Sequence, residues 1–247
     1  MNILLYVALF LIGTIVGNFW QKAIYRIPRN ISIIKKGVTN IEPETKLKYS
    51  KKILQLFYIL LGGILFVIFG RLLEIDIYNL KLSAIIMYIF TILYLTILVI
   101  IAGIDKKYIN IEKKVSTSGI IVSIMYIVYL YIIDPSSIYF NAVCLVLYII
   151  LLITDTICLR KYAKNSYTIG ILVLYNIILV FSEVYIFAYT IAITAIEIVL
   201  YLLILKINQR KNGNKRIKID RIPVGYFLSI SNIIVLCVLA ITQIVQV

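Results

Sequence analysis

Long apolar segments alternate with short polar segments along the whole chain, and this alternation is the strongest pattern in the sequence. A helix of about 20 mostly apolar residues is long enough to cross the hydrocarbon core of a bilayer. The pattern predicts about eight such helices, over residues 3–20, 53–70, 83–104, 118–133, 138–159, 167–182, 184–205 and 223–246. We therefore expect an all-α, polytopic membrane protein with short loops, in which residues 1–247 form a single membrane domain.

Basic residues are concentrated in every second loop of this arrangement. Loops 21–52, 105–115, 159–166 and 206–222 hold 23 of the 25 Lys and Arg residues, and only Arg71 and Lys81 lie elsewhere. Because cytoplasmic loops carry an excess of Lys and Arg, these four loops are expected on the cytoplasmic side, with both termini on the other side. Loop 21–52 is then the largest hydrophilic element.

Composition supports this assignment and removes several classes of protein. The chain is 62% hydrophobic and 15% charged, which is far more apolar than a soluble domain. Its net charge of +14 would suggest a nucleic-acid partner in a soluble protein. Here the basic loops explain the charge by topology, so we expect the lipid bilayer and no nucleic acid as the surroundings.

Metal and nucleophilic chemistry are not expected from this composition. The chain has no histidine, and its three cysteines, Cys144, Cys158 and Cys237, lie in apolar segments without a CxxC pair. A zinc site or a disulfide framework is therefore not expected, and a Ser-His or Cys-His arrangement is excluded. We expect no cofactor.

Asp105 is the first candidate for chemistry, because it lies where the apolar segment 83–104 meets a basic loop. Ionisable groups at the edge of a membrane domain are functional candidates by default. The alternative is that Asp105 ends its helix and pairs with Lys106 or Lys107. Two carboxyl groups that share one proton can activate a water against a peptide bond, so chemistry of that kind needs a second acid from another helix.

Two further acids lie in the apolar segments. Glu197 falls near the middle of its segment, where we expect it to be protonated or hydrogen-bonded inside the bundle. Asp155 falls near the cytoplasmic end of segment 138–159, where it can reach the interface or pair with Arg160 or Lys161.

Three segments resemble the motifs of bacterial type IV prepilin leader peptidases. Residues 13–32, GTIVGNFWQKAIYRIPRNIS, are similar to the family's opening pattern, GxxxGSFLNVxIYRLPRGxS. Residues 104–124, IDKKYINIEKKVSTSGIIVSI, resemble its first catalytic segment, with Asp105 in the place of the first catalytic aspartate. Residues 221–231, RIPVGYFLSIS, resemble IPFGPFLALG near its end. The motifs occur in the family's order across nearly the whole chain.

The resemblance implies a fold and an activity. It implies a multi-pass protein of the bacterial plasma membrane that acts as an aspartic endopeptidase. Its substrates would be type IV pilin-like precursors, which carry a short basic leader ahead of an apolar helix, and the cut would fall at the cytoplasmic membrane face. Asp105 would be one half of the catalytic pair, and no metal or cofactor would be needed.

The second catalytic motif of the family, GxGD, is altered in this chain. The best register is AKNSYTIGIL, which places Thr168 where the second aspartate belongs. The same register places Ala163, Asn165 and Tyr167 at glycine positions. A threonine hydroxyl neither shares a proton as a carboxyl group does nor acts as a base near neutral pH. Asp155, 50 positions after Asp105, has the right chemistry but lies outside the family register.

Other departures concern the loops. Glu112 follows Ile111 where the family has Pro-Asp, and Gln21 replaces a common asparagine. The basic loop 21–52 lacks the two CxxC pairs of many family members. That loop belongs to the part that the family associates with N-methylation by S-adenosylmethionine. Some family members lack these cysteines, so the sequence leaves methyl transfer open.

Three functions remain open at this point. One is an active prepilin leader peptidase. The second, which the altered second motif favours on chemical grounds, is a catalytically inactive member that binds pilin-like helices without cutting. The third is a small transporter or a membrane scaffold, which leaves the N-terminal motif unexplained. The spacing of Gly13 and Gly17 has its own structural reading, because small residues four positions apart allow two transmembrane helices to approach closely.

Overall fold

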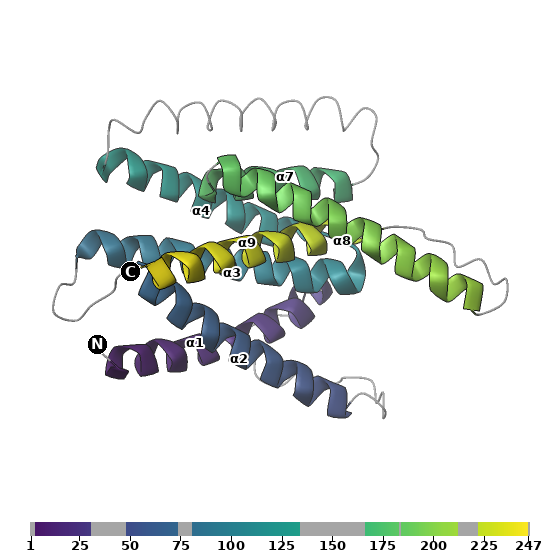
Figure 1. Cartoon of the computed structure of the whole chain (residues 1–247), viewed down its shortest axis with the longest axis horizontal. Helices are drawn as coiled ribbons and strands as arrows, with labels where there is room; N and C mark the ends of the chain where they lie inside the picture. The colour runs from purple at the N-terminus through teal and green to yellow at the C-terminus, as the bar shows by residue number, and fades with distance from the viewer. Residues whose placement is uncertain are drawn as a thin grey trace. The chain divides into compact units, whose positions relative to one another are not determined.

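The structure is a computed structural model that describes residues 3–30, 48–73, 81–133, 166–182, 184–211 and 222–246 (Figure 1). The regular elements in these ranges are all helical. They are α1 (Ile3–Arg26), η1 (Ile27–Arg29), α2 (Lys48–Leu72), α3 (Leu82–Tyr108), α4 (Lys113–Ile133), α7 (Ser166–Phe181), α8 (Val184–Lys211) and α9 (Val224–Gln246).

The all-α membrane fold expected from the sequence is confirmed. Six helices are long and apolar enough to cross a membrane, namely α1, α2, α3, α4, α8 and α9, and α7 is a shorter apolar helix. The described part thus holds seven α-helices, so the expected count of about eight is slightly high for it. The helix expected over 138–159 lies outside the described residues, together with Asp155, Cys144 and Cys158.

Several helices continue beyond the apolar segments that predicted them. α1 runs to Arg26 and α3 runs to Tyr108, so their last turns carry Arg26 and the pair Lys106 and Lys107. Cations are favourable at a helix C-terminus because of the helix dipole, and long basic side chains reach the headgroup region from there. A prediction from hydrophobicity alone ends each helix at the membrane edge, whereas the helical backbone hydrogen bonds continue into the interface.

A short 3₁₀ turn with a proline follows the end of α1. Pro28 lies in η1, and the chain then turns at Asn30, whose φ of 54° is left-handed and whose amide donates to the carbonyl of Ile27 at 3.0 Å. The guanidinium of Arg29 lies 3.9 Å from the ring centroid of Tyr25, a cation–π contact that braces the end of the helix.

The chain divides into two compact units. One comprises residues 1–96 with 237–247, and the other comprises residues 97–236. α3 and α9 each contribute residues to both units.

In the first unit, α1 and α2 cross with their backbones in close contact (Figure 1). A Cβ atom added to Gly13 would lie 2.5 Å from the carbonyl oxygen of Gly62, and one added to Gly17 would collide with the carbonyl oxygen of Tyr58. The packing role predicted for Gly13 and Gly17 is therefore confirmed, with Gly62 as the residue that receives them on α2. The amide of Gln55 also donates to Asn18 across this pair at 3.1 Å.

In the second unit, α4 and α7 pack side by side (Figure 1). Gly119 of α4 leaves space for the side chain of Ile177, and the rings of Tyr126 and Phe181 stack with centroids 4.5 Å apart. Gly119 and Ser123 are buried on this face of α4, whereas Ile121 and Met125 are exposed. An apolar exposed face is what a lipid-facing helix requires.

Candidate functional site

Asp105 lies in the last turn of α3 with 0% of its surface exposed. Its carboxylate oxygen Oδ2 accepts a hydrogen bond of 2.8 Å from the backbone amide of Tyr226, 121 positions later. A buried carboxylate is costly unless it is hydrogen-bonded, and this bond offsets part of that cost.

The Tyr226 amide is available because it belongs to the first turn of α9. The first amides of a helix have no partner within the helix, and a side-chain oxygen at the N-cap usually accepts from the second or third of them. Pro223 precedes α9 and has no side-chain oxygen. Asp105 therefore supplies the cap from a distant segment, at the end of the helix where negative charge is favourable.

The chain turns sharply just after Asp105. The amide of Ile109 closes the last turn of α3 on the carbonyl of Asp105 at 2.8 Å, and Ile109 has a φ of 49°. The left-handed region costs a β-branched residue roughly 1–2 kcal/mol. Glu112 then starts α4, because its carbonyl accepts from the amides of Val115 and Ser116 at 3.0 and 3.1 Å. The strained turn thus aims the chain from α3 directly into α4.

Ile111 joins three segments around Asp105. It is buried in the turn, and its side chain lies against Gly170 in α7 and against Gly225 in α9. A Cβ atom on Gly170 would lie 2.7 Å from Cβ of Ile111, and one on Gly225 would lie 3.0 Å from its Cδ1. The end of α3, the start of α7 and the start of α9 therefore meet at this residue.

Lys106 makes the second contact between α3 and α9. Its ammonium group donates to the hydroxyl of Tyr226 at 3.4 Å and lies 4.8 Å from the centroid of that ring. The sequence suggested that Asp105 pairs with Lys106 or Lys107; in the structure Asp105 and Lys106 each contact Tyr226 of α9. Lys106 is exposed, so the buried carboxylate has a cationic, aromatic rim.

Thr168 and Asp155, the two candidates for the partner of Asp105, are described by the structure to different extents. Thr168 lies in the first turn of α7, two positions before Gly170, and its side chain is outside the described part. Asp155 is outside it altogether. Because Gly170 contacts Ile111, the backbone of α7 near Thr168 lies close to the turn that follows Asp105. No group of three or more His, Cys, Asp or Glu side chains that could hold a metal occurs among the described residues.

A second polar cluster ties α9 to α8 within the apolar part of the second unit. Ser231 donates to the carboxyl group of Glu197 at 3.0 Å, which confirms that Glu197 is hydrogen-bonded inside the bundle. The amide nitrogen of Asn232 donates to Thr190 at 3.0 Å and to Ser182 at 3.3 Å. Sequence reasoning missed Asn232 and Thr190, although the run SISN within an apolar segment was a visible signal.

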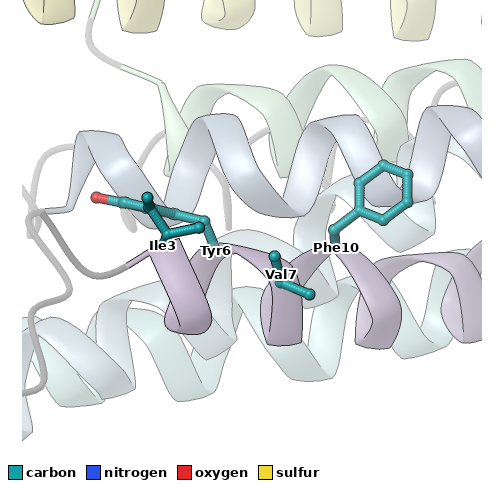
Figure 2. A pocket seen from close by; sticks show the side chains of 4 residues that line it. All are labelled: Ile3, Tyr6, Val7 and Phe10. Atoms are coloured by element: carbon teal, nitrogen blue, oxygen red, sulfur yellow. The ribbon is translucent and has the colours of Figure 1, made fainter.

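A hollow on α1 offers no comparable chemistry. It has a volume of about 270 Å³ and is lined by Ile3, Tyr6, Val7 and Phe10 (Figure 2). Three of these four side chains are purely apolar, and Ile3 and Val7 are largely exposed. Such a surface suits lipid chains rather than a reacting substrate.

No family model, curated protein or solved structure matched this chain.

Proposed function

We propose that this protein is an aspartic endopeptidase of the plasma membrane, similar to type IV prepilin leader peptidases, with Asp105 as one half of its acid pair. The observation that carries the proposal is the hydrogen bond between Asp105 and the Tyr226 amide. It joins the two segments that resemble the family's first catalytic segment and its C-terminal motif, 121 positions apart, around one buried carboxylate.

The chemistry would require two carboxyl groups of different protonation. One, as carboxylate, takes a proton from a water that attacks the scissile carbonyl carbon, and the other, as acid, protonates the departing amine. Asp105, held at the positive end of α9, suits the carboxylate role. The acid would come from Asp155, because a threonine hydroxyl at position 168 cannot supply a carboxylic proton near neutral pH.

The substrate would be a pilin-like precursor with a basic leader and an apolar helix. The apolar helix would lie in the bilayer, and the leader would remain at the cytoplasmic face with the basic loops. Asp105, at the cytoplasmic end of α3 in the predicted topology, lies at the depth where those two parts of the substrate join.

The second candidate is an inactive relative that binds pilin-like helices without cutting. Its supporting observation is the same bond, because an aspartate that caps α9 stabilises the fold even if it does no chemistry. Thr168 at the position of the second aspartate favours this candidate too.

Purified protein in lipid, incubated with a prepilin, separates the two candidates. The peptidase proposal expects a leader-length mobility shift that Asp105→Asn abolishes, because Asn can still accept from the Tyr226 amide but has no acid. Asp155→Asn should abolish it as well, and Thr168→Val should leave it intact. Cleavage that survives Asp105→Asn would overturn the proposal.

Two further variants serve as controls. Glu197→Gln removes a membrane carboxyl group but keeps an acceptor for Ser231, so cleavage should be unchanged. If the native protein does not cut, precursor binding by co-purification tests the inactive candidate, and Thr168→Asp tests whether the missing acid alone prevents cleavage.

A further inference from the structure

Gly225 lies between Asp105 and Ile111, where a side chain would make tight contacts with both. A Cβ atom at this position would lie 3.0 Å from Oδ2 of Asp105, 3.4 Å from its Cγ, and 3.0 Å from Cδ1 of Ile111. Distances this short force a neighbouring atom to move by a few tenths of an ångström. Gly225 thus permits a close approach of α9 to the carboxyl group.

The glycine is required here for space rather than for its backbone freedom. Gly225 lies in the regular first turn of α9. The described non-glycine residues with a positive φ, Asn30 and Ile109, lie elsewhere. An alanine can adopt that conformation easily and has the higher helix propensity. Any penalty for alanine at position 225 therefore arises from its contacts.

The same turn carries the donor that fixes Asp105. Tyr226 follows Gly225 directly, and its amide reaches Oδ2 at 2.8 Å while its ring and hydroxyl hold Lys106. If a side chain at position 225 pushed the carboxyl group or the turn away, the hydrogen bond from the Tyr226 amide to Asp105 would lengthen. The hydrogen bond from Tyr226 to Asp105 therefore depends on the close approach that Gly225 permits.

We infer that Gly225 is a positioning residue for Asp105: by leaving space beside Oδ2 it allows the Tyr226 amide to set the orientation of the carboxyl group. The catalytic meaning of this inference rests on the proposed function. Its physical content, that residue 225 acts on the Asp105 carboxyl group, does not.

A double-mutant cycle on thermal unfolding tests the physical content without any cleavage assay. Gly225→Ala is made in the native chain and in Asp105→Ala, where the carboxyl group is absent. The gain in helix propensity is the same in both backgrounds and cancels. We expect the shift in Tm caused by Gly225→Ala to be more unfavourable in the native background, by about 2–4 °C. Equal shifts in the two backgrounds would overturn the inference.

Gly119→Ala is the matched control for this cycle. The atoms nearest to its Cβ atom would belong to the side chains of Ile177 and Ile97 in the same unit and not to Asp105. Its shift in Tm should be the same with and without the carboxyl group. Coupling of equal size at Gly119 would show that the Asp105→Ala background is altered as a whole, which would count against the inference.

Cleavage kinetics test the catalytic meaning. If the native protein cuts a prepilin, Gly225→Ala should lower kcat about ten- to hundredfold and leave KM within about twofold, because small misplacement of a reacting group affects the reacting geometry. Ile111→Val removes Cδ1, so activity restored in the Gly225→Ala, Ile111→Val double variant would assign the loss to Ile111 and overturn the inference. Coupling in Tm without any native cleavage would instead reject the proposed function and leave the Gly225–Asp105 contact established.

Discussion

Tyr226 donates its backbone amide to the carboxylate of Asp105, so the first turn of α9 is capped by the last turn of α3. A cap supplied by a distant side chain couples two helices as well as satisfying a donor. Loss of an N-cap acceptor costs about 0.5–2 kcal/mol. The start of α9 and the conformation of Asp105 are therefore expected to respond to the same mutations.

Removal of the Tyr226 amide proton should lower stability more than removal of its ring. Proline is tolerated in the first turn of a helix, and the preceding Gly225 has no Cβ to clash with it. We expect Tyr226→Pro to be at least about 0.5–2 kcal/mol less stable than Tyr226→Ala, because proline lacks the donor and its ring carbon Cδ takes the place of the hydrogen that points at Asp105. Thermal unfolding of the two variants in detergent measures the difference, and equal stability would argue against a cap by Asp105.

Substitution of the glycines between α1 and α2 should have effects that depend on what the new methyl group meets. Gly17→Ala places its Cβ against backbone atoms of Tyr58 and Ile59, which cannot move separately from α2. We expect a loss of about 1–3 kcal/mol, as for overpacked cores. Gly70→Ala meets the flexible end of Leu9 at 2.5 Å and touches the Tyr88 ring at an ordinary 3.7 Å, so it should cost less in the same melting assay. The reverse order would contradict the close packing at Gly17.

Replacement of Asn232 by leucine should weaken the attachment of α9 to α8. The variant loses the bonds to Thr190 and Ser182 at similar side-chain volume, and interhelical bonds in membranes contribute about 0.6–1.7 kcal/mol. Cys237, five positions later on α9, can report the change by its rate of thiol labelling after Cys144 and Cys158 are replaced. Ser118→Ala, which removes an exposed bond within α4, should leave that rate unchanged.

The predicted topology assigns sides to exposed positions at the ends of the helices. In a chain without native cysteines, cysteines at Asn30 and Lys113 should be shielded from an impermeant reagent in intact cells. A cysteine at Lys81 should react, because it lies on the side that has few basic residues. Reaction at Asn30 with protection at Lys81 would invert the topology.

Hydrophobicity predicted the helices well because bilayer thickness sets their length. The predicted segment 83–104 falls inside α3, and 167–182 matches α7 to within one residue at each end. The continuation of α1 to Arg26 escaped this pattern, since hydrogen bonds and snorkelling basic residues, rather than apolar surface, determine the end of the helix there.

The residues that contact each other were harder to predict than the helices. Gly13 and Gly17 indicated a close helix contact, but their spacing contains no information about Gly62 on the other helix. Asp105 stood out because a carboxylate at a membrane edge is costly. Its partner did not, because the Tyr226 donor is a backbone amide and every residue except proline has one. The positive φ of Ile109 was also unpredictable, because isoleucine is among the residues least suited to it.

The glycine contact between α1 and α2 has a consequence for the order of biosynthesis. Gly13, Gly17 and Gly62 all lie in the first third of the chain, so both halves of this helical hairpin are present soon after α2 enters the bilayer. The contacts of Asp105, in contrast, need the Tyr226 amide and are incomplete until synthesis is nearly finished. A nascent chain therefore gains a packed helical hairpin early and the hydrogen bond between Asp105 and Tyr226 last.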